Sequence, residues 1–139
     1  MHKYFARGVA LLATFCLWGA TAVAGEPYGE CDYYVGYACV TPYLYSAYNG
    51  TGVGDYPVQV TPQGGTESVF YTNSNGASNG YIVLIASVGQ TWLIAPTPNQ
   101  HSCGTWTPAY QNWTQNTGFD PNNPGGTVGV PTFVTYNNC

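Results

Sequence analysis

The side chains able to perform acid–base or nucleophilic chemistry are few. After Arg7 the chain contains one histidine, His101, and neither lysine nor arginine. His101 could act as a general base for Ser102, with Asp55 or Asp120 orienting its imidazole. No Gly-x-Ser-x-Gly motif or comparable signature surrounds any serine. We therefore interpret His101 as a loop residue rather than as part of a catalytic triad.

Carboxylates are the second possible source of catalysis. A glycosidase needs two of them facing each other across a sugar, about 5–10 Å apart. The six acidic residues are Glu26, Glu30, Asp32, Asp55, Glu67 and Asp120. Their spacing identifies no such pair, and a small single domain leaves little room for a catalytic cleft. The sequence leaves enzymatic activity uncertain and favours a protein that is not an enzyme.

The acidic residues could instead bind calcium. No carboxylate after Arg7 can form a salt bridge to lysine or arginine, because that part of the chain has neither. Asp120 and Asn122 offer oxygen ligands in a short loop, but they do not match the EF-hand pattern, and neither do the acids of residues 26–32. Asp120 and Asn122 are therefore a weak calcium candidate. We expect no cofactor and no other metal site.

Aromatic residues are the strongest positive feature of the sequence. Eight of the 13 tyrosines lie between residues 28 and 56, and Trp106, Tyr110 and Trp113 lie among Thr, Asn and Gln. Tyr and Trp combine a flat apolar face with a polar group, which suits stacking on a neutral sugar. We predict that Trp106, Tyr110 and Trp113 form an exposed ligand-binding surface. Most tyrosines are expected to fill a core poor in Leu and Ile, and the same packing role is the alternative for these three.

Charge narrows the possible partners. Six acidic side chains and no lysine or arginine remain after Arg7. Binding to nucleic acid and to anionic membranes depends on those basic residues, so we exclude both partners. The partners that remain are a neutral polysaccharide, a cell-surface glycan or copies of the protein itself.

The N-terminus has the three parts of a secretory signal peptide. Basic residues lie within Met1–Arg7, an apolar run covers residues 9–20, and Ala22-Val23-Ala24 matches the cleavage pattern. We expect cleavage after Ala24 and a single mature domain of residues 25–139, secreted or, in a bacterium, periplasmic or on the cell surface.

The mature chain has four cysteines, Cys31, Cys39, Cys103 and Cys139. They predict two disulfides whose pairing stays open, rather than a zinc site.

Valine and aromatic residues, with frequent Gly and Pro, predict short strands and no long helix. Strands are expected at residues 56–61 and 68–72, separated from the next strand by a polar loop over 73–80. The apolar run 81–88 predicts a central strand covered on both faces. Gly89-Gln90 then predicts a type II′ hairpin turn into a strand over 91–95.

The two ends of the mature domain have weaker strand patterns. Residues 33–45 predict one or two strands interrupted at Pro42. Alternating side chains from Val128 to Tyr136 predict an edge strand, despite Pro131. The region between, residues 96–126, is rich in Pro, Asn, Thr and Gln and is predicted to be mostly loop.

Together these patterns predict an all-β fold, a small disulfide-stabilised antiparallel β-sandwich. A small barrel and a loop-rich single sheet are the alternatives.

The function favoured is non-catalytic binding of neutral carbohydrate by a secreted protein. An extracellular structural, adhesive or matrix subunit that self-associates is the alternative, followed by an effector or inhibitor lacking trypsin cleavage sites. Asn49 and Asn112 begin Asn-x-Thr sequences that could be glycosylated, depending on the host.

Overall fold

The computed structural model describes residues 26–139, and the predicted signal peptide with its cleavage site lies outside them. Four short helical turns are present: α2 (Glu26–Gly29), η2 (Glu30–Tyr34), η3 (Gly76–Ser78) and α3 (Pro124–Thr127). The strands are β1 (Ala38–Val40), β2 (Tyr43–Ser46), β3 (Thr51–Gly52), β4 (Pro57–Pro62), β5 (Ser68–Tyr71), β6 (Leu84–Ala86), β7 (Thr91–Pro96), β8 (Gln111–Thr114), β9 (Val128–Gly129) and β10 (Thr132–Thr135). No helix of this described part is long and apolar enough to cross a membrane.

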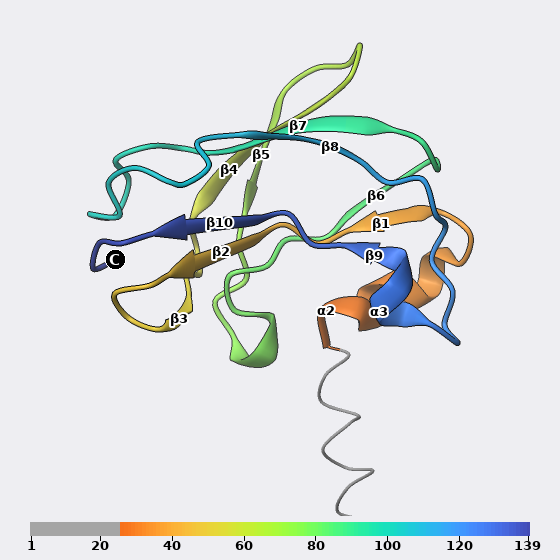
Figure 1. Cartoon of the computed structure of the whole chain (residues 1–139), viewed down its shortest axis with the longest axis horizontal. Coiled ribbons are helices and arrows are strands. Elements are labelled where there is room, and N and C mark those ends of the chain that lie inside the picture. Colours follow the sequence, from red (N-terminus) through yellow and green to blue (C-terminus); the bar gives the residue numbers. More distant parts are fainter. Residues whose placement is uncertain (1–25) are drawn as a thin grey trace, which may run out of the picture.

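Three sheets form two layers, which confirms the predicted all-β sandwich. The largest sheet has the antiparallel order β5-β4-β7-β8, and the smaller sheets have the orders β6-β1-β9 and β10-β2-β3. In Figure 1, β7 and β8 lie above β10, β2, β1 and β9. The smaller sheets differ from the prediction because each contains one parallel pair, β1 with β9 and β2 with β10. A parallel partner requires a long crossover, and here most of the chain lies between the paired strands.

The four-stranded sheet follows the sequence pattern. Along β4, Val58 and Val60 are buried while Gln59 and Thr61 face outward. Pro57 begins this strand, a position where a missing N–H is tolerated. On β7, Trp92 and Ile94 point to the same core. The predicted strands at 56–61, 68–72 and 91–95 are therefore confirmed.

The predicted hairpin between residues 81–88 and 91–95 is wrong. Only Leu84–Ala86 forms a strand, and it lies at the edge of another sheet, paired with β1. The Gln90 N–H donates to the Ser87 carbonyl, and Gly89 has a φ of 86°. A positive φ at this third position makes the turn type II, whose twist splays the two strands instead of pairing them. β6 and β7 therefore enter different layers.

Proline divides both strands of the parallel ladder. The predicted interruption at Pro42 separates β1 from β2, and Pro131 separates β9 from β10 at the facing position. The predicted single alternation from Val128 to Tyr136 is wrong, because the buried face shifts at Pro131. Phe133 and Thr135 are buried on β10, which does lie at a sheet edge as expected.

Two disulfides are present, and the structure resolves their pairing. Cys31 is bonded to Cys39, and Cys103 is bonded to Cys139. The first joins η2 to β1 in a small core cluster with Phe119. The second ties the C-terminus to the loop after β7, next to the main core. The main core consists of Val40, Leu44, Val53, Tyr56, Val58, Val60, Ile82, Leu84, Trp92, Ile94, Cys103, Trp106 and Phe133.

Candidate functional site

The predicted aromatic surface does not form, because Trp106 is a core residue. Its side chain is 4% exposed and packs edge-on against Tyr56 with ring centres 5.0 Å apart. The expectation that Trp106 is exposed is therefore wrong. The physical reason is tertiary: the Cys103–Cys139 disulfide and a backbone bridge from Thr107 to Val134 pull this polar loop onto the core.

Trp113 belongs to a strand, β8, within the region that the sequence predicted as loop. Trp113 lies opposite the buried Trp92, packs against the main core and donates its indole N–H to Gln115 Oε1. Tyr110 precedes the strand and is 61% exposed. Three residues of the predicted surface therefore occupy three different environments. Gln111–Thr114 alternates between half-buried and exposed residues in the structure, but Trp113 is its one apolar residue, so the sequence carries little strand signal here.

The remaining candidates for chemistry are dispersed. Asp120 Oδ1 accepts the Asn122 N–H at 2.9 Å, which closes a local turn. Between residues 26 and 139 no group of three or more His, Cys, Asp or Glu side chains is placed to hold a metal. Calcium binding by Asp120 and Asn122 stays a prediction. The His101 ring packs edge-on against Tyr56, with ring centres 5.9 Å apart.

Most tyrosines do not fill the core, contrary to the sequence expectation. Only Tyr56 is fully buried among the described tyrosines, and seven are exposed. Tyr43 and Tyr81 form a stacked pair with ring centres 4.2 Å apart. Partial burial is the main cause that raises the pKa of both phenols. The nearby Tyr45 raises the pKa of Tyr43 further. Tyr43, and after it Tyr28, does the same for Tyr81. This pair gives neutral aromatic surface and no acid or base near neutral pH.

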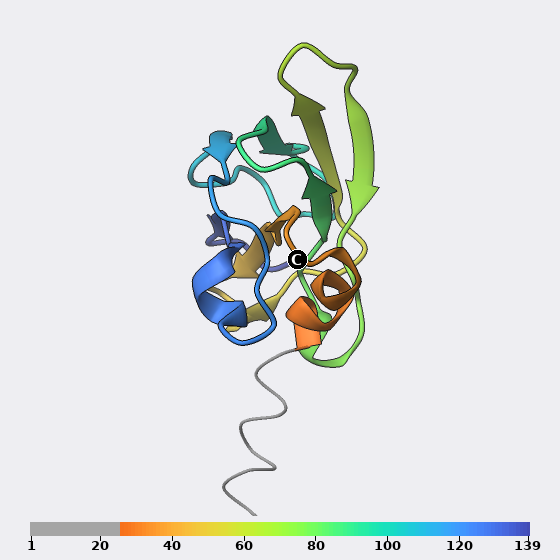
Figure 2. The ribbon, with the colours of Figure 1, turned by 90° about the vertical axis from the view of Figure 1, so that its right-hand side faces the viewer.

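The most unusual surface is β5, the edge strand of the four-stranded sheet. All four of its residues, Ser68–Tyr71, are exposed. Val69 is 50%, Phe70 39% and Tyr71 66% exposed, so apolar groups face solvent on both sides of the strand. Figure 2 shows the yellow-green β4–β5 hairpin standing away from the rest of the molecule. Within residues 26–139, no strand pairs with the free side of β5.

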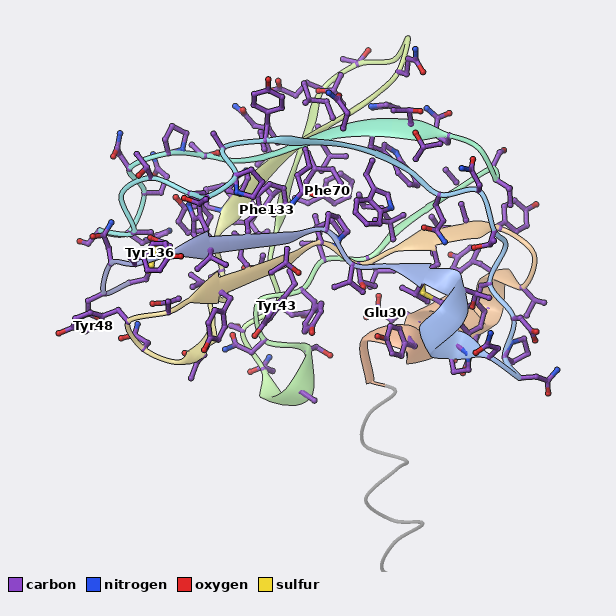
Figure 3. The ribbon with its side chains drawn as sticks, viewed as in Figure 1. Glu30, Tyr43, Tyr48, Phe70, Phe133 and Tyr136 are labelled. Atoms are coloured by element: carbon purple, nitrogen blue, oxygen red, sulfur yellow. A yellow bond between two sulfur atoms is a disulfide. The ribbon has the colours of Figure 1, made fainter. Side chains whose placement is uncertain are left out.

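An apolar groove runs beside this strand. Its volume is about 330 Å³, and it lies between the inner face of the four-stranded sheet and β6. Val60, Trp92 and Leu84 form its buried lining. Phe70 lines it from β5, and Figure 3 labels this residue between the two layers. Because β6 is also a sheet edge, the sandwich is open here; we call β5 with this groove the open edge.

The opposite edge of the same sheet is closed by side chains; we call β8 with its covering residues the closed edge. Gln111 Nε2 donates to the Thr132 carbonyl at 2.9 Å. Gln115 Nε2 donates to the Thr127 carbonyl at 3.1 Å. Trp113 packs between these two glutamines against the core. These contacts join β8 to the opposite layer.

A second hollow lies on the outer face of the four-stranded sheet. Its volume is about 360 Å³, and the turn after β4 borders it. Leu93 provides an apolar wall, while Thr61, Thr91 and Asn112 provide hydroxyl and amide groups. Neither this hollow nor the groove of the open edge is lined by a titratable side chain. Both suit neutral ligands and not acid–base chemistry.

The comparisons with known proteins do not place the chain in a family. No protein-family profile matches the sequence, and no curated protein sequence matches it. Among solved structures, the C-terminal fragment of the pilus adhesin SpaC from Lactobacillus rhamnosus GG is similar at 7% identity with a TM-score of 0.47. The similarity covers 74% of this chain and 46% of that one, so the chain spans less than half of that structure. A likeness this distant establishes neither a shared fold nor a shared function.

Proposed function

We propose that this protein is an extracellular structural or adhesive subunit that associates with copies of itself through the open edge. The observation that carries the proposal is β5, an edge strand with three exposed apolar residues beside an apolar groove. An edge strand presents unpaired N–H and C=O groups that can pair with a strand of another chain. Here both the backbone and the side chains favour such pairing.

The usual protections of an edge strand are missing from β5. Soluble proteins discourage edge pairing with lysine, proline, bulges or covering loops. Ser68–Tyr71 contains no charged residue and no proline, and Glu67 is the nearest charge. At the closed edge of the same sheet, the side chains of Gln111 and Gln115 bridge to the opposite layer. No hydrogen bond of this kind starts from β5 within residues 26–139, so the two edges of this sheet differ.

Export supports the extracellular part of the proposal. Disulfides persist mainly in oxidising compartments, and the two pairs found here agree with the secretion predicted from residues 1–24. A neutral edge also suits self-association in a chain of net negative charge, because the contact brings no acidic groups together. The proposal needs neither a cofactor nor a catalytic group.

Sedimentation analysis of residues 25–139 over a wide concentration range tests the proposal. We expect the average mass to rise with concentration. Val69→Lys should lower the association constant by tenfold or more, because it places a charge on the open edge. Asn112→Lys is the matched control, since it adds the same charge at an exposed position on β8 and should leave association unchanged. A chain that stays monomeric at millimolar concentration, or equal losses in both variants, would contradict the proposal.

Binding of neutral carbohydrate at the outer hollow is the second candidate function. The supporting observation is an uncharged depression with Leu93 beside Asn112, Thr61 and Thr91. Tyr110 lies two residues before Asn112 in the sequence, and an exposed ring of this kind could stack on a sugar. Retention on insoluble polysaccharides that is weakened by Tyr110→Ala, but not by Tyr136→Ala, would support this function. No retention on any polysaccharide tested would count against it.

A further inference from the structure

We infer that two copies pair antiparallel along β5, about a two-fold axis that passes beside Phe70. The inference rests on the proposed function and specifies its interface. The two four-stranded sheets would then form one eight-stranded sheet across the dimer. Such an interface is isologous, because the same strand serves on both sides, and it therefore closes at two copies.

The side chains of β5 complement themselves in this register. Residues directly opposite in an antiparallel pair point to the same face of the sheet. Phe70 lies opposite Val58 on the inner face, so Val69 and Tyr71 point outward. With the axis beside Phe70, each Val69 meets Tyr71 of the second copy and the two Phe70 rings meet each other. Aromatic rings paired with β-branched residues are a favourable cross-strand combination.

Charge selects the antiparallel direction. Glu67 is the acidic residue next to the strand. In the proposed register the two Glu67 residues are six positions apart along the sheet, which is about 20 Å at ~3.3 Å per residue. That exceeds the Debye length of about 8 Å at physiological salt. A parallel, in-register pair would instead bring them to about 5 Å, the distance between neighbouring strands.

On the inner face of the sheet, the dimer would cover apolar surface of the groove. Each groove is lined by Phe70 at the free side of β5 and by buried Val60 and Trp92 further in. A second strand beside β5 extends the roof of the groove and brings a second Phe70 ring to its mouth. Apolar area that faces solvent in one copy is thereby covered in the dimer.

The small area of the interface limits the expected affinity of the dimer. Three partly exposed apolar residues on each copy are well below the ~1,200 Å² of total area that stable interfaces bury. We therefore expect a reversible dimer, with a dissociation constant of about 10 μM or weaker. Larger assemblies would need a second contact besides the open edge.

Single cysteines along the strand test the register. Phe70→Cys should form a covalent dimer under mild oxidation, because the axis places this position opposite itself. Val69→Cys and Tyr71→Cys should each link poorly alone and link efficiently when mixed in equal amounts. That mixture retains Phe70, so it also tests the register if the loss of the ring weakens pairing. Asn112→Cys is the control for random collision. Cross-linked peptides require a chymotrypsin-type protease, because residues 8–139 lack Lys and Arg.

The outcomes separate the register from the proposed function. Cross-linking of Phe70→Cys alone and of the 69/71 mixture supports the two-fold axis. Equal cross-linking of each single variant indicates a parallel pair and overturns the inference. If none cross-links above the Asn112→Cys control while sedimentation shows association, the inference fails and self-association stands through another surface. If the unmodified chain is monomeric in sedimentation, both the inference and the proposed function fail.

Discussion

Phe70 and Trp113 occupy corresponding places at the two edges of one sheet, yet their surroundings differ. Both point to the inner face, Phe70 from β5 and Trp113 from β8. Trp113 is covered by Gln115 and packs on the core. Phe70 remains 39% exposed beside an open groove. Both residues belong to the same sheet, so the difference lies in the contacts that each edge makes with the opposite layer.

The comparison shows that an edge is covered by side chains that reach across the layers. At the closed edge the amides of Gln111 and Gln115 donate to backbone carbonyls of the C-terminal segment. Gly129 makes this close approach possible, because a Cβ there would lie 2.5 Å from Trp113 Nε1. At the open edge, Ser68 and Thr66 are too short for such bridges. The difference between the two edges predicts unequal effects of substitution at each of them.

The largest effect should come from removing the two edge aromatics in turn. Trp113→Ala should lower the free energy of unfolding by about 2–4 kcal/mol, since a large packed side chain is lost. Phe70→Ala should cost less, about 1–2 kcal/mol in the monomer, because 39% of the residue is already exposed to water. Urea unfolding at a concentration below that of self-association measures both. Equal costs would show that the two edges are packed alike.

A methyl group at Gly129 should disturb the closed edge next. Gly129→Ala places a Cβ 2.5 Å from Trp113 Nε1 and 2.6 Å from Gln115 Oε1, and overpacking of this kind costs about 1–3 kcal/mol. Gly125→Ala is the control, because nothing lies within 4 Å of a Cβ there. Thermal and urea unfolding compare the variants. A stability change no larger than that of the control would mean that Trp113 and Gln115 can move aside freely.

Loss of the bridging amide should have a smaller effect. Gln115→Ala leaves the Thr127 carbonyl and the Trp113 indole N–H without their partner, at a cost of about 1–2 kcal/mol. Asn116→Ala changes the exposed neighbour and should stay within about 0.5 kcal/mol of the parent. Hydrogen exchange of the β8 amides should rise in Gln115→Ala. Unchanged exchange and stability would show that packing alone closes this edge.

The smallest effect should come from the charge beside the open edge. Glu67→Gln should raise the association constant by no more than about threefold, since screened charges about 20 Å apart interact weakly. Sedimentation at low and physiological salt gives this value. An increase of tenfold or more at physiological salt would place the two carboxylates close together and contradict the antiparallel register. Glu30→Gln, which changes an exposed acid on η2 away from β5, is the control.

The sequence patterns predicted strands correctly where one face of a strand packs against the core. The alternation of Val58 and Val60 identified β4, and Val69-Phe70-Tyr71 identified β5. The prediction failed at Gly89, where a type II turn sends successive strands into different layers. A two-residue turn signal describes the bend but not the layer in which the next strand finds its partner. The choice of partner depends on residues far away in the chain.

The aromatic residues show the same limit. Composition correctly identified an unusual number of rings, but it assigned most tyrosines to the core and Trp106 to the surface, and the structure reverses both assignments. Trp106 is surrounded in sequence by Thr and Gly, so no local pattern indicates burial. Its core contact with Tyr56 joins segments that are far apart in the chain, and the Cys103–Cys139 disulfide holds the same loop to the C-terminus.

The amino-acid composition alone limits the chemistry that this protein can perform. The lack of lysine and arginine after Arg7, four cysteines and a β-forming composition led to a disulfide-bonded all-β domain suited to neutral partners. The pairing of the cysteines, the exposure of each aromatic residue and the position of the open edge became evident from the three-dimensional structure. The physical reason is that composition fixes which groups are present, while exposure depends on contacts between segments far apart in the chain. At β5 the edge stays open, because within residues 26–139 no hydrogen bond joins a side chain of the opposite layer to this strand.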